Sequence, residues 1–117
     1  MTRPNKPYYP LRDVKNLLRC NHFEFTDDAL ESGHNDFEWG GSEMTQALLR
    51  LNDRLHKLDP EKNHYYKTKP HRFYPNTMMD YYKIRNGHEG NRIYTHLCVY
   101  AGGSGKLIIS SFKELQI

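Results

Sequence analysis

The fold is decided near the end of the chain, by Asn91-Arg-Ile-Tyr-Thr-His-Leu-Cys-Val-Tyr-Ala101, Gly102-Gly-Ser-Gly105 and Lys106-Leu-Ile-Ile-Ser-Ser-Phe-Lys-Glu-Leu115. The two outer segments are rich in β-branched and aromatic residues, and the segment between them holds three glycines. Such arms around a glycine-rich turn are typical of a β-hairpin. We therefore expect two antiparallel strands here and take them as the centre of a sheet.

Side chains of a strand point alternately to its two faces, so each arm divides into two sets. In the first arm the expected core set is Ile93, Thr95, Leu97 and Val99, and the other face carries Tyr94, His96, Cys98 and Tyr100. In the second arm the expected core set is Ile108, Ser110 and Phe112. Lys113 then points away from the core, where its ammonium group is available to an anion.

Helical patterns fill the first half of the chain. Apolar residues at helical spacing after Pro10 predict a helix that ends near Cys20. Thr26, followed by two aspartates, is a good N-cap for a short second helix to about Gly33. Ser42 caps a third helix whose apolar stripe continues to Leu55. We expect a short extended link over 23–25 and a loop over 34–41.

Strand patterns fill the second half. Strands are expected over 64–69 and 77–84, with a proline-bounded loop over 70–76 and a glycine-bearing turn over 85–90. Helices first and strands last favour an α+β fold with an antiparallel sheet and the N-terminal helices packed on one face. No repeat or linker divides the chain, so residues 1–117 are expected to form a single domain.

The composition favours a folded, polar protein. Aromatic residues make up 13% of the chain and supply core material. No stretch resembles a signal peptide or approaches the roughly 20 apolar residues of a membrane span, so we expect a cytoplasmic protein with no membrane partner. Cys20 and Cys98 are too few for a disulfide framework, and we expect reduced thiols.

Charge is distributed unevenly along the chain. Residues 1–59 hold 8 Lys/Arg against 10 Asp/Glu, a balance of -2, whereas residues 60–117 hold 9 against 4, a balance of +5. The basic half also carries most of the tyrosines. Cations interleaved with aromatic rings suit phosphate contact and base stacking, although a solvated sheet with aromatic cross-strand pairs has the same composition.

Several kinds of catalytic site lack their sequence signatures. The 7 histidines show no metal-ligand spacing, so neither a metal nor another cofactor is expected. The run from Gly102 to Lys106 joins two strands and does not open a helix, which a phosphate-binding loop would do. No Gly-x-Ser-x-Gly motif is present, and Cys98 lies within a strand.

What remains is metal-free cleavage or binding of RNA. Cleavage needs a base for the 2′-hydroxyl, cations for the developing charge and an acid for the leaving oxygen. Strand alternation makes Lys67 available on the face opposite Tyr66, and Tyr94, His96 and Lys113 available in the hairpin. The further RNA-binding candidates are Lys69, His71, Arg72, Tyr81, Lys83 and Arg92.

The chain resembles the motility quorum-sensing regulator (MqsR) toxin family. The resemblance runs from Tyr9-Pro-Leu-Arg-Asp-Val-Lys-Asn-Leu-Leu18 through Thr26-Asp-Asp-Ala29 and His64-Tyr-Tyr-Lys-Thr68. It continues through Asp80-Tyr-Tyr82 and Ile93-Tyr94 to Leu107-Ile-Ile-Ser-Ser-Phe-Lys-Glu114, with an insertion near 52–63. The resemblance implies a RelE-like fold, sequence-specific cleavage of single-stranded mRNA, and a cognate antitoxin protein as partner.

By position, the resemblance implies catalytic roles for Lys67, Tyr94 and Lys113. Two departures from the family pattern matter. Met79 stands where the family has a glutamine, and His96 stands where it has a lysine. Because Met79 cannot donate a hydrogen bond to phosphate, either activity is weakened, or His96 or His71 has taken over that role. The ordinary pKa of histidine, near 6.5, suits proton transfer.

Three functional hypotheses follow. The first is a ribosome-independent, metal-independent endoribonuclease toxin that inhibits translation, with Lys67 and Lys113 on the scissile phosphate, Tyr94 assisting and His96 as acid or base. The second is a non-catalytic RNA- or protein-binding module on the same scaffold, and the third is a metal-dependent hydrolase.

Overall fold

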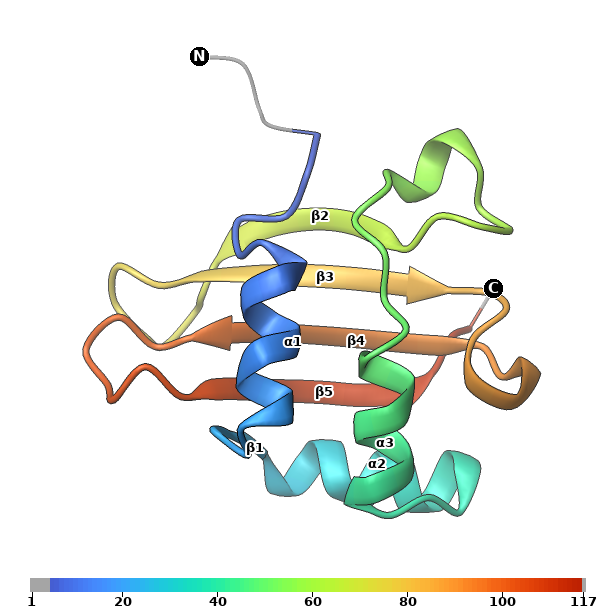
Figure 1. The fold of residues 1–117 in the computed structure, drawn as a ribbon, viewed down its shortest axis with the longest axis horizontal. Helices are drawn as coiled ribbons and strands as arrows, with labels where there is room; N and C mark the ends of the chain where they lie inside the picture. Colours follow the sequence, from blue (N-terminus) through green and yellow to red (C-terminus); the bar gives the residue numbers. More distant parts are fainter. Residues whose placement is uncertain (1–4, 117) are drawn as a thin grey trace.

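The computed structural model describes residues 5–116 and has one mixed sheet with helices on one side of it (Figure 1). The α-helices and strands, in chain order, are α1 (Leu11–Arg19), β1 (Phe23–Phe25), α2 (Asp27–Phe37), α3 (Gly41–Leu48), β2 (Tyr65–Pro70), β3 (Met78–Ile84), β4 (Ile93–Val99) and β5 (Leu107–Glu114), with short 3-10 helices at His56–Leu58 and His88–Gly90. The strand order is β1-β5-β4-β3-β2, and all neighbours are antiparallel except β1 and β5. The expected α+β class is confirmed.

The helices cover the sheet unequally. α1 and α3 lie over one face, and α2 runs beside β5 (Figure 1). Leu18 and Val14 of α1, Leu48 of α3 and Tyr82 of β3 are almost fully buried in the core between these layers. The core therefore lies on one side of the sheet, and within residues 5–116 no helix lies over the centre of the opposite face.

The first helix has the expected extent, but the other two differ. Thr26 caps α2 as expected, because its Oγ1 accepts from the amide of Ala29 at 3.2 Å. α2 continues past Gly33 to Phe37, so the expected loop over 34–41 is wrong for its first four residues. Phe37 stacks on Trp39 with ring centroids 4.7 Å apart, and this packing stabilises the extra turn. Gly33 allows close helix approach: a Cβ there would lie 2.6 Å from the sulfur of Met44.

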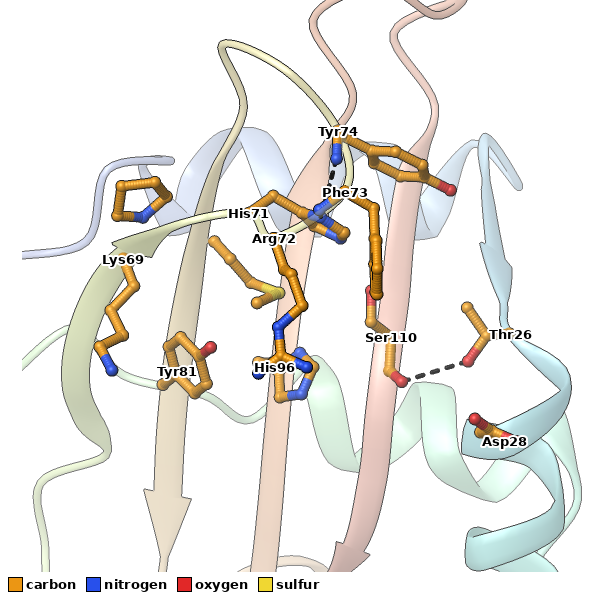
Figure 2. Close-up of a pocket in the computed structure, with 12 residues that line it drawn as sticks. Thr26, Asp28, Lys69, His71, Arg72, Phe73, Tyr74, Tyr81, His96 and Ser110 are labelled. Carbon is orange, nitrogen blue, oxygen red and sulfur yellow. Dashed lines mark hydrogen bonds between the residues drawn. The ribbon is translucent and has the colours of Figure 1, made fainter.

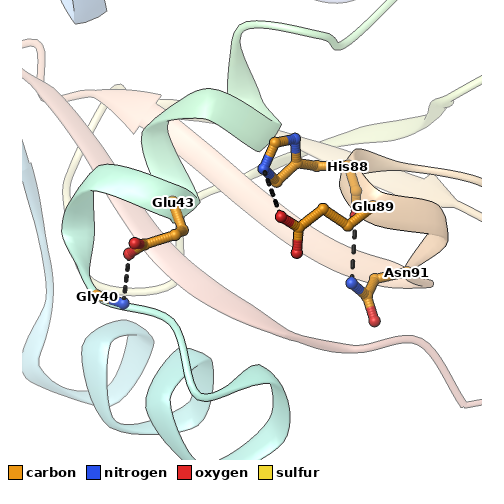
Figure 3. A network of polar contacts seen from close by, with 5 residues as sticks. All are labelled: Gly40, Glu43, His88, Glu89 and Asn91. Carbon is orange, nitrogen blue, oxygen red and sulfur yellow. Dashed lines mark hydrogen bonds and ion pairs between the residues drawn. The ribbon is translucent and has the colours of Figure 1, made fainter.

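The third helix starts earlier and ends earlier than the sequence suggested. Gly40 is the N-cap and Ser42 lies within the first turn; the side chain of Glu43 accepts from the Gly40 amide at 2.9 Å (Figure 3). The helix ends at Leu48, so its expected continuation to Leu55 is wrong. The side chain of Asn52 accepts hydrogen bonds from the backbone amides of Arg54 and His64. These hydrogen bonds compete with the backbone hydrogen bonds that would extend the helix beyond Leu48.

The expected link over Phe23–Phe25 is a strand. β1 pairs in parallel with β5, with Phe23 opposite Leu107 and Phe25 opposite Ile109. The sheet is therefore not purely antiparallel. The short β1 covers only the beginning of β5, and α2 lies beside the rest.

A bulge in β5 changes the predicted faces of the hairpin. His96 lies opposite Ser111 and Leu97 opposite Ile109, so Ser110 is an extra residue. The buried residues of β5 are Leu107, Ile109 and Phe112, and the expected core positions of Ile108 and Ser110 are wrong. The bulge keeps Phe112 in the core and leaves Lys113 on the opposite face, as expected.

The segment before α1 is fixed to the sheet by Asp80. This fully buried carboxylate accepts from the amides of Tyr8 at 3.0 Å and Tyr9 at 2.9 Å, and from the hydroxyl of Thr68. Burial raises the pKa of Asp80, and the hydrogen bonds oppose that shift. Asp80 is thus a structural group on the helix-covered face.

Candidate nucleic-acid interface

Most sequence-predicted site residues lie on the sheet face that α1 and α3 leave open. Strand pairing sets Lys67 opposite Tyr81, Tyr81 opposite His96, and Tyr94 between Lys83 and Lys113. Figure 2 shows His96, Tyr81 and Lys69 in front of the strands, with α1 and α3 behind and the start of α2 at the side. The structure therefore brings residues from four strands onto one surface, which we call the open face.

The open face carries a row of alternating cations and rings. The Lys67 ammonium lies 5.1 Å from the Tyr81 ring centroid, and Tyr81 lies 6.3 Å from Tyr94. The Lys113 ammonium lies 5.5 Å from the Tyr94 centroid. These distances suit cation–π contacts, which hold the ammonium groups over the sheet without neutralising them.

Tyr66 is part of the open face, and the prediction that Lys67 lies opposite it is wrong. Tyr65 pairs with Tyr82 and Lys67 with Tyr81, so Tyr66 is the extra residue of a second bulge. The ring of Tyr66 lies 3.8 Å from the Lys83 ammonium and 4.9 Å from that of Lys67. Strict alternation could not have placed it there.

The cations of the open face have no carboxylate partners within the described part of the chain. The Lys and Arg ion pairs between residues 5 and 116 join Arg85 to Glu61, Lys106 to Glu24 and Arg12 to Asp13, and His88 lies 3.9 Å from Glu89; all of these lie elsewhere. Among the cations on and beside the open face, those with no carboxylate within ion-pair distance in residues 5–116 are Lys67, Lys69, Arg72, Lys83 and Lys113. Positive charge is thus left to act on an external anion.

An open cavity of about 830 Å³ adjoins this row. Met79, Tyr81, His96 and Ser110 line it from the sheet, and the loop after β2 closes one side. Thr26 and Asp28, at the start of α2, line the other side (Figure 2). The cavity therefore lies between the 71–74 loop and α2, over the middle of the sheet.

The loop is held in shape by His71. Its Nδ1 accepts from the amides of Phe73 at 3.0 Å and Tyr74 at 3.1 Å. The His71 ring stacks on Tyr74 with centroids 4.4 Å apart, and Tyr74 contacts Tyr100 at the same centroid distance. Burial lowers the pKa of His71, which agrees with a neutral ring whose Nδ1 is an acceptor.

His96 does not titrate near neutrality as the sequence suggested. Burial above all, and then the charges of His71 and Lys113, lower its pKa to about 4. Its Nδ1 is buried with no hydrogen-bond partner among the described residues. At pH 7 the ring is therefore neutral, so it has no imidazolium proton to donate, and the low pKa makes it a weak base.

The phenol of Tyr94 is suited to donating a hydrogen bond. Burial, with smaller contributions from Tyr81 and Tyr66, raises its pKa above 10.0. The hydroxyl therefore keeps its proton at physiological pH. The Cys98 thiol is less suited to chemistry, because burial raises its pKa to about 11 and the thiolate is the reactive form.

Five predicted residues lie outside the cavity, namely Lys67, Lys83, Arg92, Tyr94 and Lys113, and several cavity residues were missed. Arg92 precedes β4 and Lys83 lies near the end of β3, both at the end of the sheet away from the 71–74 loop. Thr26, Asp28 and Ser110 line the cavity but were not candidates. The sequence treated Thr26 and Asp28 as helix-capping residues, and Ser110 as a core residue.

Metal-binding groups are not gathered in the described structure. Between residues 5 and 116, no three His, Cys, Asp or Glu side chains are close enough to hold one metal ion. No helix formed by these residues has the length and apolar character needed to cross a membrane.

The chain matches no protein-family model and no curated protein sequence.

Proposed function

We propose that this protein is a metal-independent, ribosome-independent endoribonuclease that cleaves single-stranded mRNA and thereby inhibits translation, as the toxin of a type II toxin-antitoxin module. The observation that carries the proposal is the juxtaposition of Lys67, Tyr94 and Lys113 on the open face. The charges of Lys67 and Lys113 are not neutralised by carboxylates within the described chain, and the adjoining rings suit RNA bases. The resemblance to the MqsR family supports the same activity.

The proposed reaction is an internal transesterification. The ribose 2′-oxygen forms a bond to phosphorus as its proton passes to a base, and the bond from phosphorus to the 5′-oxygen breaks as that oxygen takes a proton. The products end in a 2′,3′-cyclic phosphate and a 5′-hydroxyl. Lys67 and Lys113 stabilise the extra negative charge on the phosphorane, because positioned cations act most strongly where charge develops.

Tyr94 and His96 divide the remaining tasks in this proposal. The protonated phenol of Tyr94 donates to a phosphate oxygen or the leaving oxygen. The neutral His96 ring is the candidate base for the 2′-hydroxyl, because it is unprotonated at neutral pH; its pKa of about 4 makes it a weak base. The RNA strand is held on either side by Lys69, His71, Arg72, Tyr81, Lys83 and Arg92.

Met79 favours a second candidate, a non-catalytic RNA-binding module. This side chain is 7% exposed and lies in the cavity, where it offers no hydrogen bond to phosphate. The two candidates share the open face and differ only in turnover. In either case we propose that the protein acts in the cytoplasm. If the protein is the toxin, we propose that a cognate antitoxin protein binds it.

One experiment separates the two candidates. Purified protein is incubated with a mixed-sequence RNA in the presence and absence of a chelator, and the product ends are mapped. Discrete products ending in cyclic phosphate, formed equally with chelator, support the nuclease. Binding without products supports the module, and loss of cleavage with chelator supports a metal-dependent hydrolase.

A further inference from the structure

We propose that the cavity beside the row of cations takes one nucleobase with an exocyclic amino group, selected by the Asp28 carboxylate, and that it disfavours uracil. This inference deepens the proposed function and relies on it for the RNA strand that enters the cavity. It adds a specificity-determining residue that the sequence did not indicate. The argument rests on the two walls of the cavity, its floor and the chemistry of the base edges.

The two walls have opposite charge. Lys69 and Arg72 lie on the side of β2 and its following loop, and Asp28 lies on the side of α2 (Figure 2). No cationic side chain between residues 5 and 116 forms an ion pair with Asp28. A ligand that matches both walls is anionic at one end and offers hydrogen-bond donors at the other. A nucleotide has this polarity when its base carries an amino group.

The cavity also has surfaces for a flat ring. The Met79 side chain is buried in its floor, and the stacked His71 and Tyr74 rings belong to the loop that closes one side. Phe73 is 76% exposed in the same loop. Exposed aromatic side chains next to cations are the usual platform for an unstacked RNA base. The volume of about 830 Å³ is within the range of small-ligand sites.

Asp28 is the acceptor available on the α2 wall. The neighbouring Thr26 hydroxyl is already engaged, because it donates to the Ser110 carbonyl at 3.2 Å and accepts from the Ala29 amide. An ionised carboxylate only accepts hydrogen bonds. It pairs with the amino group of cytosine, adenine or guanine and repels the O4 carbonyl oxygen that uracil presents where cytosine has its amino group.

The first test maps cleavage of a randomised RNA by the wild type and two variants. In the wild type, uracil is depleted by about 10-fold or more at one position near the scissile bond, as expected for a hydrogen-bonded base contact. Asp28→Asn supplies an amide that both donates and accepts, so uracil becomes accepted there. Asp27→Asn is the matched control: Asp27 is exposed in the same helical turn and does not line the cavity, so the wild-type profile is retained.

The second test does not depend on cleavage. The methyl resonance of Met79 is followed by NMR during titration with CMP and with UMP. CMP shifts this resonance at a concentration about 10-fold lower than UMP does in the wild type, and Asp28→Asn removes the difference.

The outcomes separate this inference from the proposed function. RNA cleavage that accepts uracil at every position, or a preference unchanged in Asp28→Asn, overturns the inference and leaves the nuclease intact. If no RNA is cut, the proposed function fails, and the NMR titration with CMP and UMP then tests the base site by itself. An Asp28-dependent preference for CMP then supports the base site, and equal shifts by CMP and UMP overturn it.

Discussion

Lys113 lies directly opposite Tyr94 in the β4–β5 ladder, with its ammonium group 5.5 Å from the centroid of the phenol ring. The contact holds the lysine beside Tyr94, whose ring lies 6.3 Å from that of Tyr81, and Tyr81 in turn contacts Lys67. A cation held by a ring keeps its full charge, whereas one held by a carboxylate loses most of its field. This pair is therefore where we expect phosphate to bind.

Replacing Lys67 or Lys113 should remove most of the RNA-cleavage activity and should change the stability of the fold only slightly. We expect Lys67→Ala and Lys113→Ala each to lower the rate of RNA cleavage by at least about 100-fold, because each removes a positioned charge from the transition state. Neither should change the melting temperature by more than about 2 °C, since neither side chain is buried in the core.

Lys57→Ala is the matched control for the two lysine variants. Lys57 is exposed in the segment between α3 and β2, away from the open face. Its removal should leave the cleavage rate within about twofold of wild type. Activity in Lys67→Ala or Lys113→Ala equal to that of Lys57→Ala contradicts the site assignment.

Tyr94→Phe should distinguish the contribution of the Tyr94 hydroxyl to cleavage from the contribution of its ring. The ring contact with Lys113 is retained, so we expect unchanged stability and a loss of about 100-fold in cleavage, the effect of removing one positioned hydrogen-bond donor. Single-turnover cleavage measures this loss. Tyr8→Phe, at a 59% exposed tyrosine before α1, is the control. If both variants cleave at the wild-type rate, Tyr94 is only a packing residue.

The pH dependence of cleavage should reflect the low pKa of His96. Because the folded protein holds this pKa at about 4, a base at His96 is active above that pH and becomes protonated and inactive as the pH falls through it. We expect kcat/KM to be flat from about pH 6 to 8 and to fall below about pH 5. Circular dichroism at each pH checks that the protein stays folded. A fall centred near 6.5, or a rise toward acid, rules out this role.

Asp80→Asn should destabilise the protein without touching the open face. The carboxylate accepts from two amides and a hydroxyl, and an asparagine must turn its NH2 group toward one of these donors. We expect a loss of about 1–3 kcal/mol in the free energy of unfolding, measured by urea denaturation. Asp53→Asn, at an exposed aspartate, should cost less than about 0.5 kcal/mol. Equal midpoints for the two variants contradict the role given to Asp80.

Local patterns were sufficient for parts of the candidate site. The alternation in Ile93–Val99 placed Tyr94 and His96 on the face opposite Leu97, and the structure has them there. The helical spacing after Pro10 gave α1. These predictions succeed because a strand or helix with one buried face repeats its apolar residues at a fixed period. The pKa of His96 was not accessible in this way, since it depends on burial beneath residues distant in the sequence.

The sequence alone determined the α+β order of elements, the hairpin and the side of the sheet on which Lys113 lies. The tertiary structure decided the two bulges, at Tyr66 and Ser110, and the cavity that joins Asp28 to His96. The physical reason is that a bulge interrupts the two-residue alternation of side chains along a strand, and it forms where that interruption allows more apolar side chains to be buried against the rest of the protein. With Ser110 extra, Leu107, Ile109 and Phe112 all enter the core, which stabilises the fold by about 1.5–3 kcal/mol for each large apolar side chain buried. No pattern within β5 contains that information, because the surfaces that bury these residues come from other parts of the chain.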